Sequence, residues 1–532
     1  MQRAIYLVLF GVVLVLPFIV RAALLRREAR PASRGETLVI ITPHNQDIRR
    51  EFERAFSAWH LRRYGSAVDI DYRTPGGTND INRQLKSTYD GYRDRRTRAL
   101  PPDVPADIHI VWGGGDYPFE NELKPAGILQ PMRLDPRLLR EAFPEPALAG
   151  VRLYEGTTDA SGAPMPLWVG VCLSGFGIVY NEELYVALDL PAPRSWGDLT
   201  HEKLAGLVAL ADPVHSGSAS VAYLMVVQRR MADAEEAFFA KNPELRSADK
   251  ATLAGNADYR SAIAAGWKRG MAELVLIVAN SRYFTDSSSQ VPNDVGHGQA
   301  AAGMAIDFYG RVFQETVGAS RCRVVLPRAA TAITPDPVAI LWGVKGRQLE
   351  LALHFVEFLL SPEGQRLWIL KVGVPGGPVE RVLRRSPIRR DVYADKTGWA
   401  DDLDPFALAG GFNQRAEWGA LFADMRLVWA AAWVDSRDAL RSAYAKVLRV
   451  KNPVQRKRLA ERLADLPITL AEVEAMRNER KRLEKEGGAD EWKAAKRIEL
   501  VKRFRAHYAR VGRGAEAWGP GGSKTRKPAG AR

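Results

Sequence analysis

Gly170-Val-Cys-Leu-Ser-Gly-Phe-Gly-Ile-Val-Tyr180 is the stretch of this 532-residue chain that decides the fold. It is a long apolar run that contains three glycines. Such a run predicts a buried β-strand, and its length suits a strand that crosses between two lobes. We therefore expect an α/β region on each side of it.

The segment before this strand alternates between strand and helix patterns. Apolar runs predict strands at 36–42, 67–72 and 107–112, and apolar residues at helical spacing predict a helix after each of the first two. This order is typical of βαβ units, whose parallel sheets bind ligands outside the carboxyl ends of the strands. We expect the turns after the three strands at one sheet edge: His44-Asn45-Gln46, Gly76-Gly77-Thr78 and Gly113-Gly114-Gly115.

A second α/β region follows the crossing strand. Apolar runs predict strands at 207–211, 301–308, 323–326 and 338–342, and helices at 266–278 and 349–360. From about residue 415 the pattern becomes helical, with charged helices over 451–512 broken at Pro453 and Pro467. Residues 519–532 are rich in Gly, Pro, Lys and Arg, which predicts a disordered basic tail.

The net charge of +14 lies at the two ends of the chain. Residues 1–30 hold five Arg against one Glu, and residues 451–532 hold 22 Lys and Arg against 11 Asp and Glu. Residues 31–450 are nearly neutral, which disfavours a main fold that binds a nucleic-acid backbone. The basic helices near the C-terminus are interpreted as a solvated helical pair or as a contact surface for anionic lipid.

The N-terminus carries a membrane-targeting pattern. Ile5 to Val20 is a 16-residue stretch without a charge, and Arg3 precedes it. We interpret residues 1–30 as a signal peptide or as a membrane anchor over 5–25. The arginines at 21, 26, 27 and 30 argue the other way, because the positive-inside rule would keep the following domain in the cytoplasm.

The sequence gives no sign of catalysis or of a disulfide framework. We find no P-loop, GxSxG, HExxH or CxxC motif. Cys172 and Cys322 are too few for a disulfide scaffold or a zinc ribbon, and we favour two buried thiols over one disulfide. We therefore expect a protein that is not an enzyme and has no resident cofactor.

Several segments, in the right order over about 36–395, resemble an extracellular solute-binding protein of an ABC importer. They are Val179-Tyr180-Asn181 with Leu188-Asp-Leu-Pro-Ala-Pro193 and Ser195-Trp-Gly-Asp-Leu199; Gly206-Leu-Val-Ala-Leu-Ala-Asp-Pro213 with Ser216-Gly-Ser-Ala219; Asn280, Ser287-Ser-Ser289 and 295–303; Ser361-Pro-Glu-Gly-Gln365; and Val372-Gly-Val-Pro375. The ferric-ion-type branch is the most similar. Its relatives also bind phosphorylated or phosphonate organic anions and thiamine.

This resemblance implies two α/β lobes with mostly parallel sheets, joined by hinge strands, and a ligand in the cleft between them. We expect the first lobe at 36–172 and 323–412, the second at 173–322, the return crossing near 305–326, and a C-terminal helical extension at 413–518. It also implies export to the periplasm, lobe closure on the ligand and delivery to an ABC permease. A ligand sensor or assembly protein with the same fold is the alternative from another class.

The resemblance favours a small anionic or organic ligand, with ferric ion as the alternative. A helix that begins at Ser216 offers free N–H groups to an anion, and a helix start at Ser287-Ser288 could do the same. The alternative at both places is an ordinary serine helix cap. Family members that bind iron carry two tyrosines where this chain has Phe308-Tyr309, which puts iron in doubt. Arg282 or Arg311 could pair with a phosphate, whereas His215 and His297 are interpreted as structural or exposed.

The candidate ligand-binding residues are therefore His44, Asn45, Gly77, Thr78, Gly114, Gly115, Ser174, Ser216, Gly217, Ser218, Ala219, Ser287, Ser288, Asp307 and Tyr309. His44 and Tyr309 would be the metal ligands if the protein carried Fe(III). Otherwise His44 helps to cap the next helix with Asn45, Tyr309 is a packed aromatic residue, and the glycines only satisfy turns.

Overall fold

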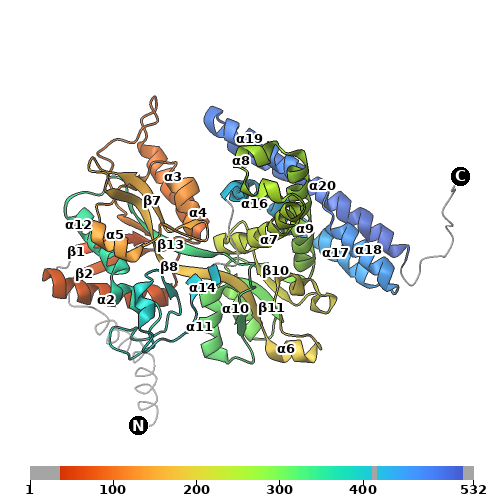
Figure 1. Ribbon diagram of the computed structural model, residues 1–532, viewed down its shortest axis with the longest axis horizontal. Coiled ribbons are helices and arrows are strands. Elements are labelled where there is room, and N and C mark those ends of the chain that lie inside the picture. Colours follow the sequence, from red (N-terminus) through yellow and green to blue (C-terminus); the bar gives the residue numbers. More distant parts are fainter. Residues whose placement is uncertain (1–35, 410–415, 519–532) are drawn as a thin grey trace, which may run out of the picture.

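The computed structural model describes residues 36–409 and 416–518, which form two α/β lobes and a helical extension (Figure 1). The predicted anchor at 1–30 and the predicted basic tail at 519–532 lie outside the described residues. No helix within the described ranges is long and apolar enough to cross a membrane.

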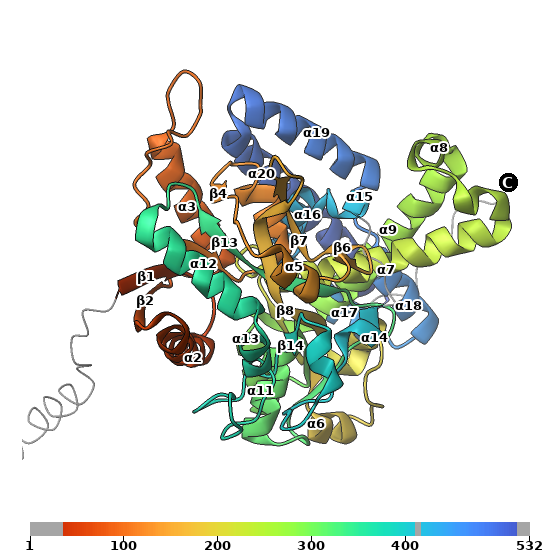
Figure 2. The same cartoon turned by 60° about the vertical axis from the view of Figure 1, so that its left-hand side comes forward.

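Lobe 1 is built on a small parallel sheet. β1 (Glu36–Ile41) pairs in parallel with β2 (Val68–Arg73) and β3 (Ile110–Trp112). The connecting helices are α2 (Gln46–Tyr64) and α3 (Thr78–Tyr92), and α12 (Gly346–Leu360) packs beside α2 and β1 (Figure 2). This arrangement brings the carboxyl ends of β1, β2 and β3 to one edge, as their order in the sequence predicts.

Lobe 2 repeats this parallel arrangement with longer helices. β9 (Val208–Ala211) lies between β10 (Ser281–Thr285) and β11 (Ala302–Ile306) and pairs in parallel with both. α7 (Gly217–Lys241) and α9 (Ala257–Ala279) pack closely against each other. A Cβ added at Gly270 would lie 2.6 Å from the Cα of Val227, so the helices approach to a distance that only glycine permits.

The crossing strand joins the two lobes. β8 (Pro164–Tyr180) has 17 residues; its first part pairs with β13 (Ile333–Leu341) and its last part with β11 and β12 (Arg323–Val325). All three pairings are antiparallel, so the parallel strands at the core of each lobe are joined by antiparallel hinge strands into one mixed sheet. The two hinge strands run in opposite directions, because β8 leads the chain out of lobe 1 and β13 leads it back. The return lies between β12 and β13, at the end of the predicted range.

The remaining elements are short or lie at the periphery. In chain order they are α4 (Asp116–Pro118), β4 (Leu129–Gln130), α5 (Pro136–Ala142), β5 (Ala147–Leu148), β6 (Val151–Arg152), β7 (Tyr154–Thr158), α6 (Glu182–Ala187), α8 (Lys250–Gly255), α10 (Gln290–Gly296), α11 (Asp307–Val317), α13 (Pro362–Leu367), β14 (Ser386–Pro387), α14 (Pro405–Ala409) and α15 (Ala416–Gly419).

The C-terminal extension packs on lobe 2 and shares its core. It consists of α16 (Phe422–Trp429), a π-helical turn at Ala430–Val434, α17 (Arg437–Leu448), α18 (Pro453–Ala464), α19 (Leu470–Glu486) and α20 (Ala489–Glu516). Trp429 and Trp433 are fully buried and both meet the ring of Tyr223 in α7 edge to face. The extension is therefore joined to lobe 2 by one continuous apolar core.

Part of the charged face of the extension is ion-paired. Within helices, Arg482 pairs with Glu479 and Lys496 with Glu499, and across helices Arg480 pairs with Asp424. This pattern is typical of a solvated helical surface. Elsewhere, Cys172 and Cys322 are both buried and unpaired, which confirms the prediction of two thiols.

Candidate functional site

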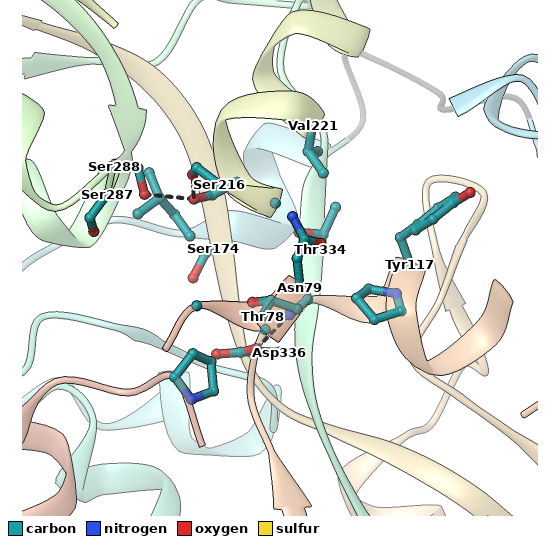
Figure 3. Close-up of a pocket in the computed structure, with 18 of the residues that line it drawn as sticks. Thr78, Asn79, Tyr117, Ser174, Ser216, Val221, Ser287, Ser288, Thr334 and Asp336 are labelled. Carbon is teal, nitrogen blue, oxygen red and sulfur yellow. Dashed lines mark hydrogen bonds between the residues drawn. The ribbon is translucent and has the colours of Figure 1, made fainter. Parts of the chain in front are cut away.

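A cavity of about 460 Å³ lies between the two lobes. Its walls come from the start of α3, the turn after β3, the middle of β8, the start of α7, the turn at 286–288, β13 and α16. Figure 3 shows Thr78, Ser174, Ser216, Ser288 and Asp336 converging on this space from both lobes. The site is therefore a cleft at the carboxyl ends of the strands, bounded by both hinge strands.

The start of α7 presents hydrogen-bond donors to the cavity. Ser216 is the N-cap, and its Oγ accepts from the N–H of Ala219 at 3.2 Å. The hydroxyls of Ser216, Ser218 and Ser288 form a chain, with Oγ–Oγ distances of 3.3 and 2.7 Å. The N–H groups of Gly217 and Ser218 have no acceptor among the described residues. Free N–H groups, hydroxyls and the helix dipole together favour a bound anion.

The start of α3 faces the start of α7 across the cleft. Unlike α7, it carries a carboxylate in its first turn, that of Asp80. Asp80 Oδ2 accepts from the N–H of Gly77, the N-cap residue of α3, at 3.2 Å. A Cβ at Gly77 would lie 3.4 Å from the carbonyl oxygen of His215 in lobe 2, so the two helix starts are in close approach. The N–H groups of Thr78 and Asn79 have no acceptor among the described residues either, but the Asp80 carboxylate beside them makes the start of α7 the better anion site.

A buried charge network forms the floor of the cavity. Arg385 Nη1 donates to Asp336 Oδ2 at 2.6 Å, and Arg385 Nη2 donates to Ser174 Oγ at 2.9 Å. His44 Nε2 lies 2.9 Å from the same Asp336 oxygen, and the N–H of Gly115 donates to Asp336 Oδ1 at 2.9 Å. Arg385 is 2% exposed, and its Nε has no hydrogen-bond partner.

The charges in this network are fixed by their neighbours. Burial alone raises the pKa of Asp336, but Arg385 and the hydrogen bond to His44 outweigh burial and hold that pKa well below its usual value. Burial lowers the pKa of His44, so the imidazole is neutral near pH 7. The network is thus a carboxylate–guanidinium pair with a neutral histidine beside it.

The geometry does not favour a ferric site. Both nitrogens of His44 are already engaged, with Nδ1 3.0 Å from Thr42 Oγ1 and Nε2 on Asp336. Burial raises the pKa of Tyr309, which disfavours the phenolate that Fe(III) prefers. No cluster of three or more His, Cys, Asp and Glu side chains suited to a metal ion occurs in the described ranges.

A second carboxyl group in the lining, besides Asp336, has a shifted pKa. Burial raises the pKa of Asp116, at the start of α4, to about 6, and the negative charge of Asp336 adds to this effect. Asp116 therefore changes its charge close to neutral pH, within the lining of the cavity.

The extension also reaches the cavity. Phe422 of α16 packs against Tyr117 of lobe 1 with ring centroids 4.3 Å apart, and both residues line the cavity. Arg426, one turn further along α16, lines it as well. No site residue was predicted in this region from the sequence, because the extension lies beyond the segments that resemble the family.

Comparison with known proteins agrees with this architecture. Residues 152–390 match the family model described as a bacterial extracellular solute-binding protein. The similarity to that family therefore covers the crossing strand β8, lobe 2 and the return to lobe 1.

Individual relatives are distant. The phosphoglycerate transport regulatory protein PgtC of Salmonella typhimurium is 24% identical over 199 residues, which are 37% of this chain and 40% of that protein. The chain thus spans about two fifths of the length of the curated relatives it matches. Among solved structures, AfuA of Actinobacillus pleuropneumoniae with fructose-6-phosphate is 17% identical (75% of this chain, 98% of that one, TM-score 0.48), and iron-bound HitA of Pseudomonas aeruginosa is 18% identical (73% and 99%, TM-score 0.44).

The structure brings most of the sequence-predicted residues together. Twelve of them line the cavity: His44, Gly77, Thr78, Gly114, Gly115, Ser174, Ser216, Gly217, Ser218, Ser287, Ser288 and Tyr309. His215 also lines it, beside Asp212 at 3.1 Å, whereas His297 is exposed and bonds to Asn293.

Three predicted residues lie outside the lining. Asn45 is exposed and caps α2 by accepting from the N–H of Ile48. Ala219 is buried in the core of lobe 2. Asp307 begins α11 instead of ending a strand, and its carboxylate pairs with Arg311 at 2.9 Å. Arg311 is therefore committed to Asp307 and Asp401, and neither it nor Arg282 lines the cavity.

Arg385, Asp336, Asn79, Tyr117 and Arg426 also line the cavity, although no sequence pattern singled them out. Arg385 and Asp336 come from loop and hinge segments far from the motifs in the chain. A proline on each side of Asp336 was the one local signal of an unusual strand position.

Proposed function

We propose that this protein is the extracytoplasmic solute-binding component of an ABC importer and that it holds a small organic anion between its lobes. The observation that carries this proposal is the start of α7, where free N–H groups and the hydroxyls of Ser216, Ser218 and Ser288 face the interlobe cavity. Lobe opening and closing would admit and release the ligand, and the closed form would present both lobes to a permease.

The rest of the lining supports an organic ligand rather than a bare ion. A cavity of about 460 Å³ is in the range of small-molecule sites. Phe176, Phe308 and Tyr309 offer apolar and aromatic surface, while Asp116 and Glu122 offer acceptors for hydroxyl or amino groups. A phosphorylated or carboxylated molecule with further polar groups fits this combination. The name of the Salmonella relative, a phosphoglycerate transport regulatory protein, supports the same ligand class.

Thermal shift followed by calorimetry on the purified protein tests the ligand class. The panel is inorganic phosphate, sulfate, 3-phosphoglycerate, a hexose phosphate, Fe(III) and spermidine. We expect an upward shift for an organic phosphate, because a ligand that binds only the folded state raises its stability. A shift with Fe(III) alone would favour the ferric alternative, and no shift with any member would contradict an importer of small anions.

A second candidate is a ligand-sensing protein with the same fold, and two observations favour it. The extension contacts lobe 1 through Phe422 and Tyr117, so it is placed to respond to lobe movement, and the Salmonella relative is named as regulatory. Uptake of radiolabelled ligand in a deletion strain separates the two candidates. Loss of uptake supports transport, whereas intact uptake with a lost transcriptional response supports sensing.

Export is part of the proposal and is tested separately. Alkaline phosphatase fused after residue 518 is active only outside the cytoplasm. Activity of the fusion in intact cells is expected, because the family match is to extracellular proteins. An inactive fusion that is present at normal amounts would contradict export.

A further inference from the structure

Arg426 is a positively charged residue of the cavity lining, and it lies outside the residues that the family model matches. It lies in α16 of the extension, whereas the solute-binding family model matches residues 152–390. Arg426 lines the interlobe cavity together with Phe422, and its guanidinium lies 6.0 Å from the centroid of the Phe422 ring. The extension thus contributes both apolar surface and charge to the site.

Two hydrogen bonds hold the guanidinium next to the start of α7. Arg426 Nε donates to the carbonyl of Pro213 at 3.0 Å, and Nη2 donates to the carbonyl of Val214 at 2.8 Å. Pro213 and Val214 lead directly into Ser216 and α7. The positive charge of Arg426 and the positive end of the helix dipole are therefore neighbours, which favours a negative group between them.

No carboxylate forms an ion pair with Arg426 within the described residues, although the charges of Glu122 and Asp212 lie near enough to favour the guanidinium. Its two bonds go to backbone carbonyls, and its Nη1 has no hydrogen bond there. The other arginine of the lining, Arg385, is paired with Asp336. Among the acids of the lining, Asp80 caps α3, and Glu122 lies 3.8 Å from Lys86. Burial lowers the pKa of Arg426, and the nearby negative charges of Glu122 and Asp212 oppose that shift only in part.

We propose that Arg426 binds the anionic group of the ligand, so that the C-terminal extension is part of the binding site. This inference rests on the proposed function and makes it more specific. A planar guanidinium with an unused N–H group beside a helix start is suited to a phosphate or carboxylate. The anionic end of the ligand would then contact Arg426 of the extension and Ser216 and Ser218 of lobe 2.

The test compares Arg426→Gln with a matched control in the same extension. Arg441→Gln removes one positive charge from an exposed position of α17 that is not in the cavity lining. The probes are inorganic phosphate, 3-phosphoglycerate and uncharged glycerol, measured by calorimetry. We expect Arg426→Gln to weaken binding of the organic phosphate at least about tenfold, Arg441→Gln to leave it within about twofold, and Arg426→Lys to retain part of it.

A measurement on the unmodified protein covers the case in which Arg426→Gln does not fold. Phenylglyoxal labels arginine side chains, and peptide mass spectrometry gives the rate at each position. We expect 3-phosphoglycerate to protect Arg426 but not Arg441. Equal labelling of Arg426 with and without a ligand that binds would overturn the inference.

The outcomes separate this inference from the proposed function. If the unmodified protein binds none of the anions, the proposed function fails and Arg426 has no ligand to bind. If the unmodified protein binds 3-phosphoglycerate and folded Arg426→Gln binds it equally well, the anion site stands and only the role of Arg426 is wrong.

Discussion

Asn79 of α3 donates a hydrogen bond from Nδ2 to the carbonyl oxygen of Val214 at 2.5 Å, which joins lobe 1 to lobe 2 across the cleft. The same carbonyl accepts from Arg426 of the extension at 2.8 Å. The three parts of the molecule therefore meet at one backbone oxygen next to the start of α7. This contact defines a closed arrangement, because opening the cleft must break it.

The Asn79 contact predicts a role in lobe closure. Asn79→Ala removes a cross-cleft bond worth about 1 kcal/mol, so we expect ligand affinity to fall severalfold and the free protein to be more open. Calorimetry measures the affinity, and small-angle scattering measures the radius of gyration. Asn121→Ala is the control, because its Nδ2 bonds only to Tyr117 within lobe 1. An unchanged affinity in Asn79→Ala would show that the contact does not contribute to closure.

The buried Arg385–Asp336 pair predicts a large loss of stability when the Asp336 carboxylate is replaced by an amide. Asp336→Asn leaves the guanidinium of Arg385 buried without its carboxylate, so we expect a loss of about 3 kcal/mol or more in unfolding free energy. Because Arg385 lines the cavity, its unpaired charge should also tighten anion binding in the fraction that folds. Denaturant unfolding gives the first quantity and calorimetry the second. A variant as stable as the unmodified protein would contradict this account of the network.

The raised pKa of Asp116 predicts that stability and anion binding both depend on pH. Its pKa is raised to about 6 in the folded protein, above that of an ordinary unfolded carboxyl near 4. Between pH 4 and 6 the folded state holds more protons than the unfolded state, so this carboxyl makes stability fall as pH rises through that window. An ionised Asp116 also repels an anion in the cavity.

We therefore expect sulfate, whose charge is constant in this range, to bind more tightly at pH 5 than at pH 7.5. Asp116→Asn should flatten the profile and raise stability at pH 7.5 but not at pH 4. Calorimetry and thermal unfolding at several pH values are the measurements. A profile of the same slope in Asp116→Asn would assign the titration to another group.

The strands were predictable from the sequence where a run of apolar residues marks a buried segment. The apolar runs at 36–42 and 170–180 correspond to β1 and β8, and the Gly-rich turns lie at the cavity as expected. Both hinge strands are longer than predicted, because β8 starts at Pro164 and β13 contains Pro335 and Pro337. Proline breaks a strand pattern in the sequence, whereas here a register shift between Asp336 and Pro337 accommodates it.

The site was predictable only in its short-range part. A helix start such as Ser216-Gly-Ser-Ala219 is visible in four residues, and its place at the cavity followed from strand order. His44 and Arg385 lie 341 residues apart, and Arg385 is one of 76 Lys and Arg residues. Its burial depends on Asp336, Ser174 and the rings of Phe308 and Trp368, which only the folded chain assembles.

The shared core predicts that the extension does not unfold independently. Trp429 is fully buried, stacks on Trp433 with centroids 5.7 Å apart and packs on Tyr223 of α7. Trp429→Ala should cost about 3–5 kcal/mol, because a large buried side chain leaves a cavity. Trp518→Ala, at a position that is 56% exposed, is the control and should change stability little.

Because Trp429 and Tyr223 belong to one core, lobe 2 and the extension should lose structure in the same transition, and ligand binding should be lost with them. Calorimetric unfolding and ligand binding, followed together across temperature, measure this coupling. In an independent extension, Trp429→Ala would instead create a separate early transition that leaves ligand affinity intact. That result would also remove the basis for a ligand-binding role of α16, because Arg426 could then leave the cleft without a change in affinity.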